Sequence, residues 1–193
     1  IDGYHCVHIS PSLADSDILA LQAALAQVRK VLREQRKPLP HMAAPCLTGT
    51  VLPEHVVLNV PCSDWRDAVH ICGAPLLAEG AIHPEYLEAV IRSVQSNGPY
   101  FVFSPHIALA HAAPTDGVER FCCSIYRPEK PVAFHHPTND PVKLLVLIGI
   151  TNVKAQIGKI SALMNLLANN AVLERLLTAQ DAKEIAAILN GNI

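Results

Sequence analysis

The chain has 193 residues, enough for one ordinary domain with a hydrophobic core and a short appendage. Half of the residues are hydrophobic and only 17% are charged, and the formal net charge of −2 gives no reason to expect nucleic-acid binding. The longest purely apolar run, at 144–150, is too short to span a bilayer, and the six cysteines form no C-x-x-C pair. We therefore expect a cytoplasmic protein with reduced thiols that does not insert into a membrane.

The N-terminal part is predicted to be a separate piece. Residues 4–10 alternate weakly in hydrophobicity, as a short strand does, and the helix-like run 15–37 carries apolar side chains on one stripe. That stripe needs a surface to cover it, which the main domain or a second copy of the chain in a homodimer could supply. Three prolines in the following segment indicate a linker. The expected organisation is a strand and helix at 1–37, a linker at 38–46 and the main domain at 47–193.

The main domain is predicted to begin with a strand at 55–60 and two helices at 63–80 and 83–98. Ser63 is the expected N-cap of the first helix, because a serine side chain can accept hydrogen bonds from the first backbone N–H groups. Pro75 is expected to bend or end that helix, because proline has no backbone N–H to donate.

Strands are predicted in the middle of the domain and helices at its end. The strand-like runs are 100–104, 107–111, 121–127, 132–134 and 142–150, and the helix-like runs are 154–168, 170–179 and 182–189. The run 142–150 is apolar on both faces and is expected to be a central strand. This order predicts an α/β or α+β domain, in which helices cover one sheet of about five strands.

Two histidines, His106 and His111, bracket a strand-like run that is rich in alanine. They are five residues apart, so a strand would place them on opposite faces and a helix would also separate them. No nearby acid or thiolate completes a tetrahedral set, and no metal site is predicted. The sequence also contains no G-x-S-x-G elbow and no glycine-rich phosphate loop, so no cofactor is expected.

His111 can be interpreted as a nucleophile or as a packed core residue. A neutral imidazole has a lone pair on one nitrogen, because its unperturbed pKa is about 6.5. That nitrogen can take a phosphoryl group if it points outward and if the other nitrogen donates its hydrogen to a fixed acceptor, such as a carbonyl at a strand end. The small apolar neighbours in "LAHAAP" would let a partner protein approach closely and would exclude water. The residues alone leave both interpretations open.

A longer stretch around His111 carries a family resemblance. The segment "NGPYFVFSPHIALAHAAPTDGV" resembles the active-site segment of enzyme IIA of the sugar phosphotransferase system, in the mannitol/fructose class and especially its ascorbate-type branch. The resemblance covers about residues 47–190. The positions that match the family pattern are Gly98, Pro99, Tyr100, Pro105, Ala108, His111, Pro114 and Gly117.

The resemblance implies a fold, a reaction and partners. The fold would be a mixed sheet flanked by helices on both faces, with no cofactor or metal. His111 would accept a phosphoryl group from the phosphocarrier HPr and pass it to a cysteine or histidine of an enzyme IIB for sugar uptake. The domain would therefore act as a phosphotransferase.

The chain departs from the family pattern around this histidine. The replaced positions are Ala110 for a proline, His106 for a glycine, Ala113 for an arginine and Thr115 for an acidic residue. Many relatives also carry a second, assisting histidine after the central strand, where this chain has Gln156. His106 would be able to assist in its place if the strand bends.

A different functional class is also open. The segment "VHISPSLADSDILALQAAL" resembles the last strand and helix of an enzyme IIB-like domain of the galactitol type. Such a domain precedes an enzyme IIA-like domain in transcriptional activators and antiterminators that the phosphotransferase system controls. In that alternative the chain is a regulatory domain, in which His111 is phosphorylated to set activity or is inert. A packing histidine in a domain without chemistry is the third hypothesis.

Overall fold

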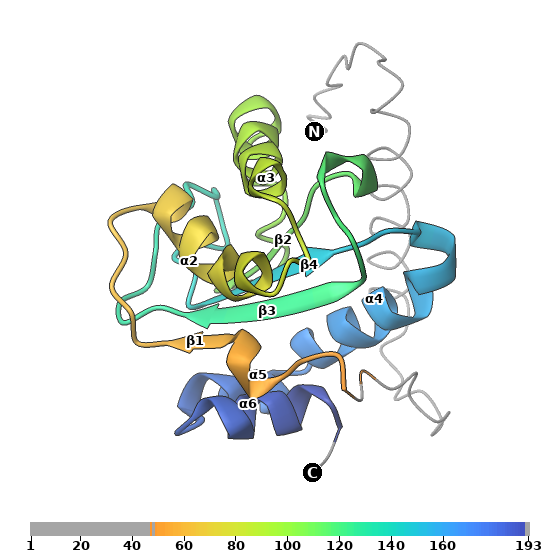
Figure 1. Cartoon of the computed structure of the whole chain (residues 1–193). Coiled ribbons are helices and arrows are strands. Elements are labelled where there is room, and N and C mark those ends of the chain that lie inside the picture. Colours follow the sequence, from red (N-terminus) through yellow and green to blue (C-terminus); the bar gives the residue numbers. More distant parts are fainter. Residues whose placement is uncertain (1–46, 48, 192–193) are drawn as a thin grey trace, which may run out of the picture. The chain divides into compact units, whose positions relative to one another are not determined.

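A computed structural model of the chain describes residues 47 and 49–191 (Figure 1). The predicted N-terminal strand and helix at 1–37 and the predicted linker at 38–46 lie outside the described residues. The described elements are η1 (Pro53–His55), β1 (Val56–Leu58), α2 (Trp65–Ala78), α3 (Pro84–Asn97), β2 (Ile107–Ala110), η2 (Pro114–Asp116), β3 (Cys122–Arg127), β4 (Leu144–Gly149), α4 (Val153–Leu167), α5 (Asn170–Thr178) and α6 (Ala182–Leu189).

The strands form one mixed sheet in the order β1-β3-β4-β2. β1 pairs parallel with β3, β2 pairs parallel with β4, and the two pairs meet where β3 and β4 run antiparallel. The α/β class and the mixed sheet that we expected are thus confirmed, with four strands in the described part of the chain. The runs 100–104 and 132–134 are not strands, because flanking prolines remove backbone donors and the structure gives these runs only turns and isolated bridges.

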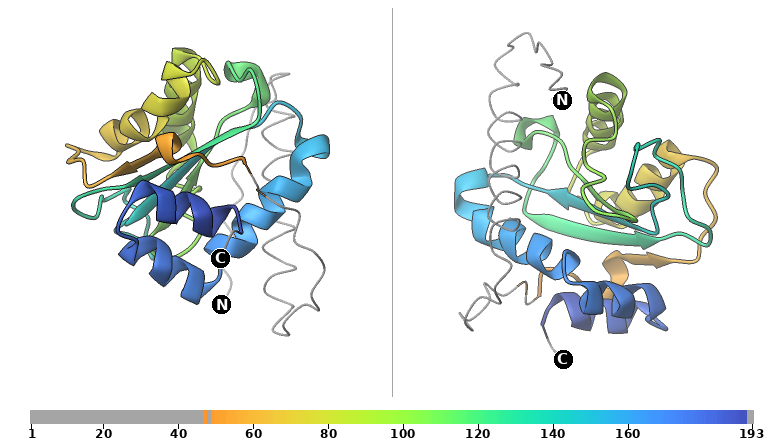
Figure 2. Two further views of the ribbon diagram at one scale, coloured as in Figure 1. Left: turned by 60° about the horizontal axis from the view of Figure 1, so that its bottom comes forward. Right: turned by 180° about the vertical axis from the view of Figure 1, so that it is seen from behind.

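Helices cover both faces of the sheet, as expected. α2 and α3 lie on one face, and α4, α5 and α6 lie on the other (Figures 1 and 2). β4 is buried along its whole length, which explains why its sequence is apolar at every position. Within the described residues, no helix combines the length and the apolar composition that a bilayer crossing needs.

The strand directions decide which chain segments meet at each end of the strands. β2 and β4 run one way, and β1 and β3 run the other way. The carboxyl end of β2 therefore lies beside the carboxyl end of β4 and the amino end of β3. This end of the sheet therefore holds His111, which follows β2. It also holds Gln156, which lies in the first turn of α4 after β4.

β2 is the last strand of the sheet on its side, and the segment before it folds back over its outer edge. Leu109 N donates to Phe101 O over 2.9 Å, and an isolated bridge joins Ser104 to Ile107. Part of the outer backbone of this edge strand is therefore already hydrogen-bonded within the chain.

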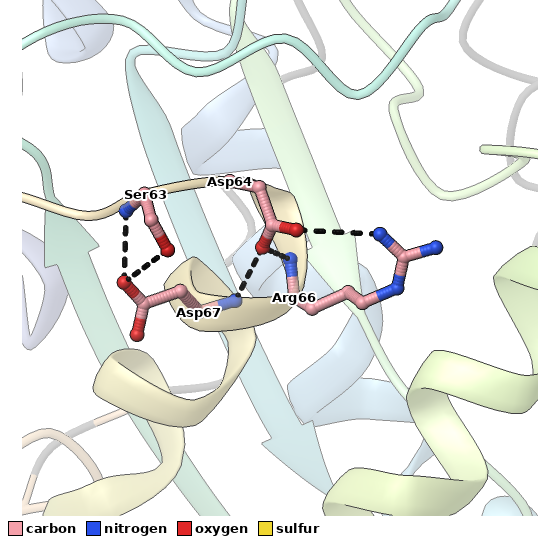
Figure 3. Close-up of polar contacts among 4 residues, drawn as sticks. All are labelled: Ser63, Asp64, Arg66 and Asp67. Carbon is pink, nitrogen blue, oxygen red and sulfur yellow. Dashed lines mark hydrogen bonds and ion pairs between the residues drawn. The ribbon is translucent and has the colours of Figure 1, made fainter.

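The N-terminus of α2 differs from the prediction at its cap (Figure 3). Asp64, and not Ser63, is the N-cap, because its carboxylate accepts from Arg66 N at 2.8 Å and from Asp67 N at 2.9 Å. The carboxylate of Asp67 in turn accepts from Ser63 N at 2.8 Å and from its hydroxyl at 3.0 Å. Pro75 lies in the last turn, so the helix continues to Ala78 before it ends.

We expect Asp64→Ala to lower the free energy of unfolding by about 1 kcal/mol, because two N–H groups lose their acceptor. The backbone hydrogen bond from Asp67 is the main cause that lowers the pKa of Asp64. The stabilisation is therefore present at neutral pH and is lost as the pH falls through the lowered pKa. Urea unfolding at neutral and acidic pH measures both effects. Ser63→Ala is the control, and an equal loss in the two variants would contradict the assignment of the cap.

Candidate functional site

His111 directly follows β2 and is held by its own strand. Its Nδ1 lies 2.8 Å from Leu109 O, two residues earlier in the chain. A carbonyl oxygen only accepts hydrogen bonds, so this contact places the ring hydrogen on Nδ1 of a neutral imidazole. The lone pair that could attack phosphorus is then on Nε2.

The ring of His111 is enclosed, whereas the nucleophile hypothesis expected a nitrogen that points outward. The residue is 3% exposed, and the two alanines that follow it are also buried. The bond to Leu109 O folds the ring back along β2, and Tyr100 covers one side, with ring centroids 5.6 Å apart at 83°. Chemistry at Nε2 therefore requires that the groups around the ring move.

The peptide group that joins His111 to Ala112 contacts two tyrosine hydroxyls. Ala112 N donates to Tyr86 Oη over 3.1 Å, and Tyr86 Oη donates to Ile148 O on β4 over 2.5 Å. On the other side of the peptide group, Tyr100 Oη donates to His111 O over 3.5 Å. Burial raises the pKa of Tyr86, so its hydroxyl stays neutral and can donate and accept at once.

Sequence reasoning missed Tyr86. It lies one position before the apolar stripe of α3, and its side chain is wholly buried. The stripe consists of Leu87, Val90, Ile91 and Val94. The only signal is that a buried tyrosine needs a partner for its hydroxyl, which does not say where the partner lies.

A tight turn fixes the chain after the histidine. Asp116 accepts from Ala113 N through Oδ2 at 3.0 Å and donates its own N–H to Ala113 O at 3.0 Å. This carboxylate is the acid nearest to His111 in the sequence, and it holds the backbone of η2.

His106 lies at the other end of β2, so the assisting role that we considered for it is not supported by the geometry. An extended chain rises about 3.3 Å per residue, which places the two histidine Cα atoms roughly 16 Å apart. His106 is the third residue of a β-turn that Ile107 N closes onto Ser104 O at 3.0 Å, and its φ is 70°. Its Nδ1 lies 2.8 Å from Pro141 O. Positive φ at the third position of a turn favours glycine, which is the residue of the family pattern here.

Gln156 lies at the same end of the sheet as His111, but its side chain hydrogen-bonds residues just before it in the chain. Its Oε1 accepts from Thr151 N at 3.0 Å and from Asn152 N at 3.3 Å, and its Nε2 donates to Thr151 Oγ1 at 2.9 Å. The side chain thus binds the turn between β4 and α4.

Acidic side chains pair with histidine and arginine side chains near this end of the sheet, at the amino ends of β1 and β3. His55 Nε2 lies 3.0 Å from Glu79 Oε2, and Glu79 Oε1 lies 3.0 Å from Arg120 Nη2. His83 Nε2 lies 2.7 Å from Glu119 Oε1. Mixed charge of this kind suits a protein partner better than a polyanion. Within the part of the chain that the structure describes, no three His, Cys, Asp or Glu side chains converge to hold a metal ion.

The opposite end of the sheet, near the carboxyl ends of β1 and β3, carries a cavity of about 370 Å³. Residues 62–66 at the start of α2 and residues 130–133 after β3 line it. Asp64 already accepts from the first N–H groups of α2, and Arg66 lies 4.5 Å from the centre of the Trp65 ring. The cavity and His111 thus lie at opposite ends of the sheet. The side chains of Asp64 and Arg66, which line the cavity, already have partners within the chain.

The assignment of the ring hydrogen gives a direct prediction. At pH 8, two-bond ¹H–¹⁵N correlation spectra of the histidine rings should show His111 with a protonated Nδ1 and an unprotonated Nε2, because Leu109 O accepts from Nδ1. His111→Gln identifies the signals. A spectrum with the hydrogen on Nε2 would contradict the assignment, because the lone pair would then be on Nδ1.

Comparisons with known proteins show which family the chain resembles. The family model described as "Phosphoenolpyruvate-dependent sugar phosphotransferase system, EIIA 2" matches residues 51–192. The chain is 36% identical over 128 residues to the mannitol-specific cryptic phosphotransferase enzyme IIA component of Escherichia coli strain K12, covering 66% of this chain and 86% of that protein. It is 31% identical over 135 residues to the ascorbate-specific PTS system EIIA component of Salmonella paratyphi A, covering 69% and 87%.

Solved structures share the fold. The solution structure of the mannitol-specific cryptic enzyme IIA CmtB from Escherichia coli superposes with a TM-score of 0.66 at 32% identity, covering 74% of this chain and 96% of that one. The complex of enzyme IIAMTL with phosphorylated enzyme IIBMTL from Escherichia coli contains a similar fold, with a TM-score of 0.62, 22% identity and coverage of 72% and 95%.

Proposed function

The chain belongs to the EIIA 2 family of the phosphoenolpyruvate-dependent sugar phosphotransferase system, and we propose that it carries a phosphoryl group on Nε2 of His111. Members of this family are phosphotransferase components that hand the group to an enzyme IIB. The observation that carries the assignment to His111 is the contact of its Nδ1 with Leu109 O, because it leaves the lone pair on the other nitrogen.

The transfer exchanges one bond to phosphorus for another. The Nε2 lone pair of His111 forms a bond to phosphorus, the bond from phosphorus to the donor atom of phospho-HPr breaks, and its electron pair returns to the donor. Both ring nitrogens of His111 are then substituted and the ring carries a positive charge. Leu109 O faces the Nδ1 hydrogen and stabilises that charge, so the acceptor that orients the ring also supports the product.

Enclosure of the ring makes partner docking part of the proposal. Since the residue is 3% exposed, Nε2 meets a phosphoryl donor only after the surrounding groups move. We propose that contact with HPr, and later with enzyme IIB, opens the ring to its partner. In the closed state water is excluded, which protects the nitrogen–phosphorus bond from hydrolysis.

The proposal extends to the organisation of the chain. Residues 47–193 form the enzyme IIA-like domain, 38–46 the linker and 1–37 a strand and helix like the tail of an enzyme IIB-like domain. A cytoplasmic location fits these partners. A homodimer, in which a second copy covers the apolar stripe expected at 15–37, is a further part of the proposal, and the mass of the protein in solution tests it against a monomer.

We expect incubation with phosphoenolpyruvate, enzyme I and HPr to place one acid-labile, base-stable phosphate on His111. His111→Ala should abolish the label. His106→Gly is the matched control and should keep it, because glycine accepts the φ of 70° at that turn. A label that survives His111→Ala would reject the site.

A chase separates the carrier from the regulatory alternative. The labelled protein is mixed with an unlabelled enzyme IIB of the ascorbate or mannitol type. Loss of the label from His111 with its appearance on enzyme IIB supports a carrier. Retention on His111 supports the domain of a transcriptional regulator, in which phosphorylation sets activity.

A further inference from the structure

Two tyrosine hydroxyls hold the peptide group between His111 and Ala112 by both of its polar atoms. The N–H donates to Tyr86 Oη over 3.1 Å, and the carbonyl accepts from Tyr100 Oη over 3.5 Å. Tyr86 comes from the first turn of α3, and Tyr100 comes from the loop between α3 and β2. We propose that these two residues form a clamp that positions His111 for phosphoryl transfer, an inference that rests on the proposed function.

Tyr86 acts where the pairing of β2 with β4 stops. The last paired residues of the two strands are Ala110 and Leu147. Just beyond them, the Tyr86 hydroxyl accepts from Ala112 N and donates to Ile148 O over 2.5 Å. The hydroxyl thus links the two strand ends just after their ladder has ended.

The clamp controls the ring through the backbone. Contacts at both the N–H and the carbonyl restrict the rotation of this peptide group, and with it the ψ angle of His111. A restricted ψ keeps the Cα–Cβ direction of His111 oriented relative to β2, so that Nδ1 reaches Leu109 O at 2.8 Å. Ser93 Oγ lies 2.9 Å from Tyr100 Oη and holds the second hydroxyl from α3.

The chain offers a matched control at the other end of the sheet, near the carboxyl end of β3. Tyr126 is wholly buried like Tyr86, and its hydroxyl donates to a backbone carbonyl, Val60 O, over 2.6 Å. Tyr126→Phe therefore removes one buried hydroxyl bond without touching the His111 segment. The thermal stability of both variants is measured as well, because Tyr86→Phe removes two hydrogen bonds and Tyr126→Phe removes one, and an effect on stability must be separated from an effect on positioning.

The experiment compares wild type, Tyr86→Phe and Tyr126→Phe in the full chain at a temperature where all are folded. Two quantities are measured: the initial rate of phosphorylation by limiting phospho-HPr, and the ¹⁵N signals of the His111 ring at pH 8. We expect Tyr86→Phe to slow transfer about tenfold or more, since small displacements of a reacting group have effects of this size. Its His111 ring signals should broaden or shift away from the pattern with hydrogen on Nδ1. Tyr126→Phe should stay within about twofold in rate and keep the wild-type ring signals.

The outcomes separate this inference from the proposed function. Unchanged His111 ring signals in Tyr86→Phe, or equal slowing in both variants, would overturn the clamp. If wild type takes no phosphate, the proposed function fails, and the ring signals alone still decide about the clamp. If Tyr86→Phe does not fold, Tyr100→Phe removes the bond to the other side of the same peptide group and decides by the same two measurements.

Discussion

The hydrogen bond between His111 Nδ1 and Leu109 O is the interaction on which the site depends. It places the ring hydrogen on Nδ1, it folds the ring along β2, and in the proposed function its carbonyl dipole would stabilise the phosphorylated ring. The bond spans only two residues of one strand end, so it requires no metal and no charged partner. Its geometry is reliable only while the backbone that bears both groups is held still.

The mixed sheet provides that support. Because β2 and β4 run parallel, the chain leaves both strands at the same end of the sheet. Ile148 O and Ala112 N therefore both lie within hydrogen-bonding distance of one hydroxyl from α3. A helix from one face of the sheet is thereby tied to the end of an edge strand and to a central strand. The site is consequently built from segments that are far apart in the sequence.

The helices and the buried strand could be predicted because each follows a local pattern. The stripe of α3 and the apolar run of β4 are visible in the sequence and are found in the structure. Residues 100–104 have strand composition, but flanking prolines turn them into a fold-back loop. The roles of His106 and Tyr86 depend on a turn with positive φ and on a contact across 26 residues, and neither has a local pattern.

The fold-back of residues 100–104 over β2 has a consequence for recognition. An unpaired edge strand is a template on which another chain can add a strand, and such addition underlies much aggregation. Leu109 N already donates to Phe101 O, so the segment blunts this edge from within. In the proposed function, HPr and enzyme IIB would then recognise the surface near His111 through side-chain complementarity and not by adding a strand, which would let each partner bind in turn and be released.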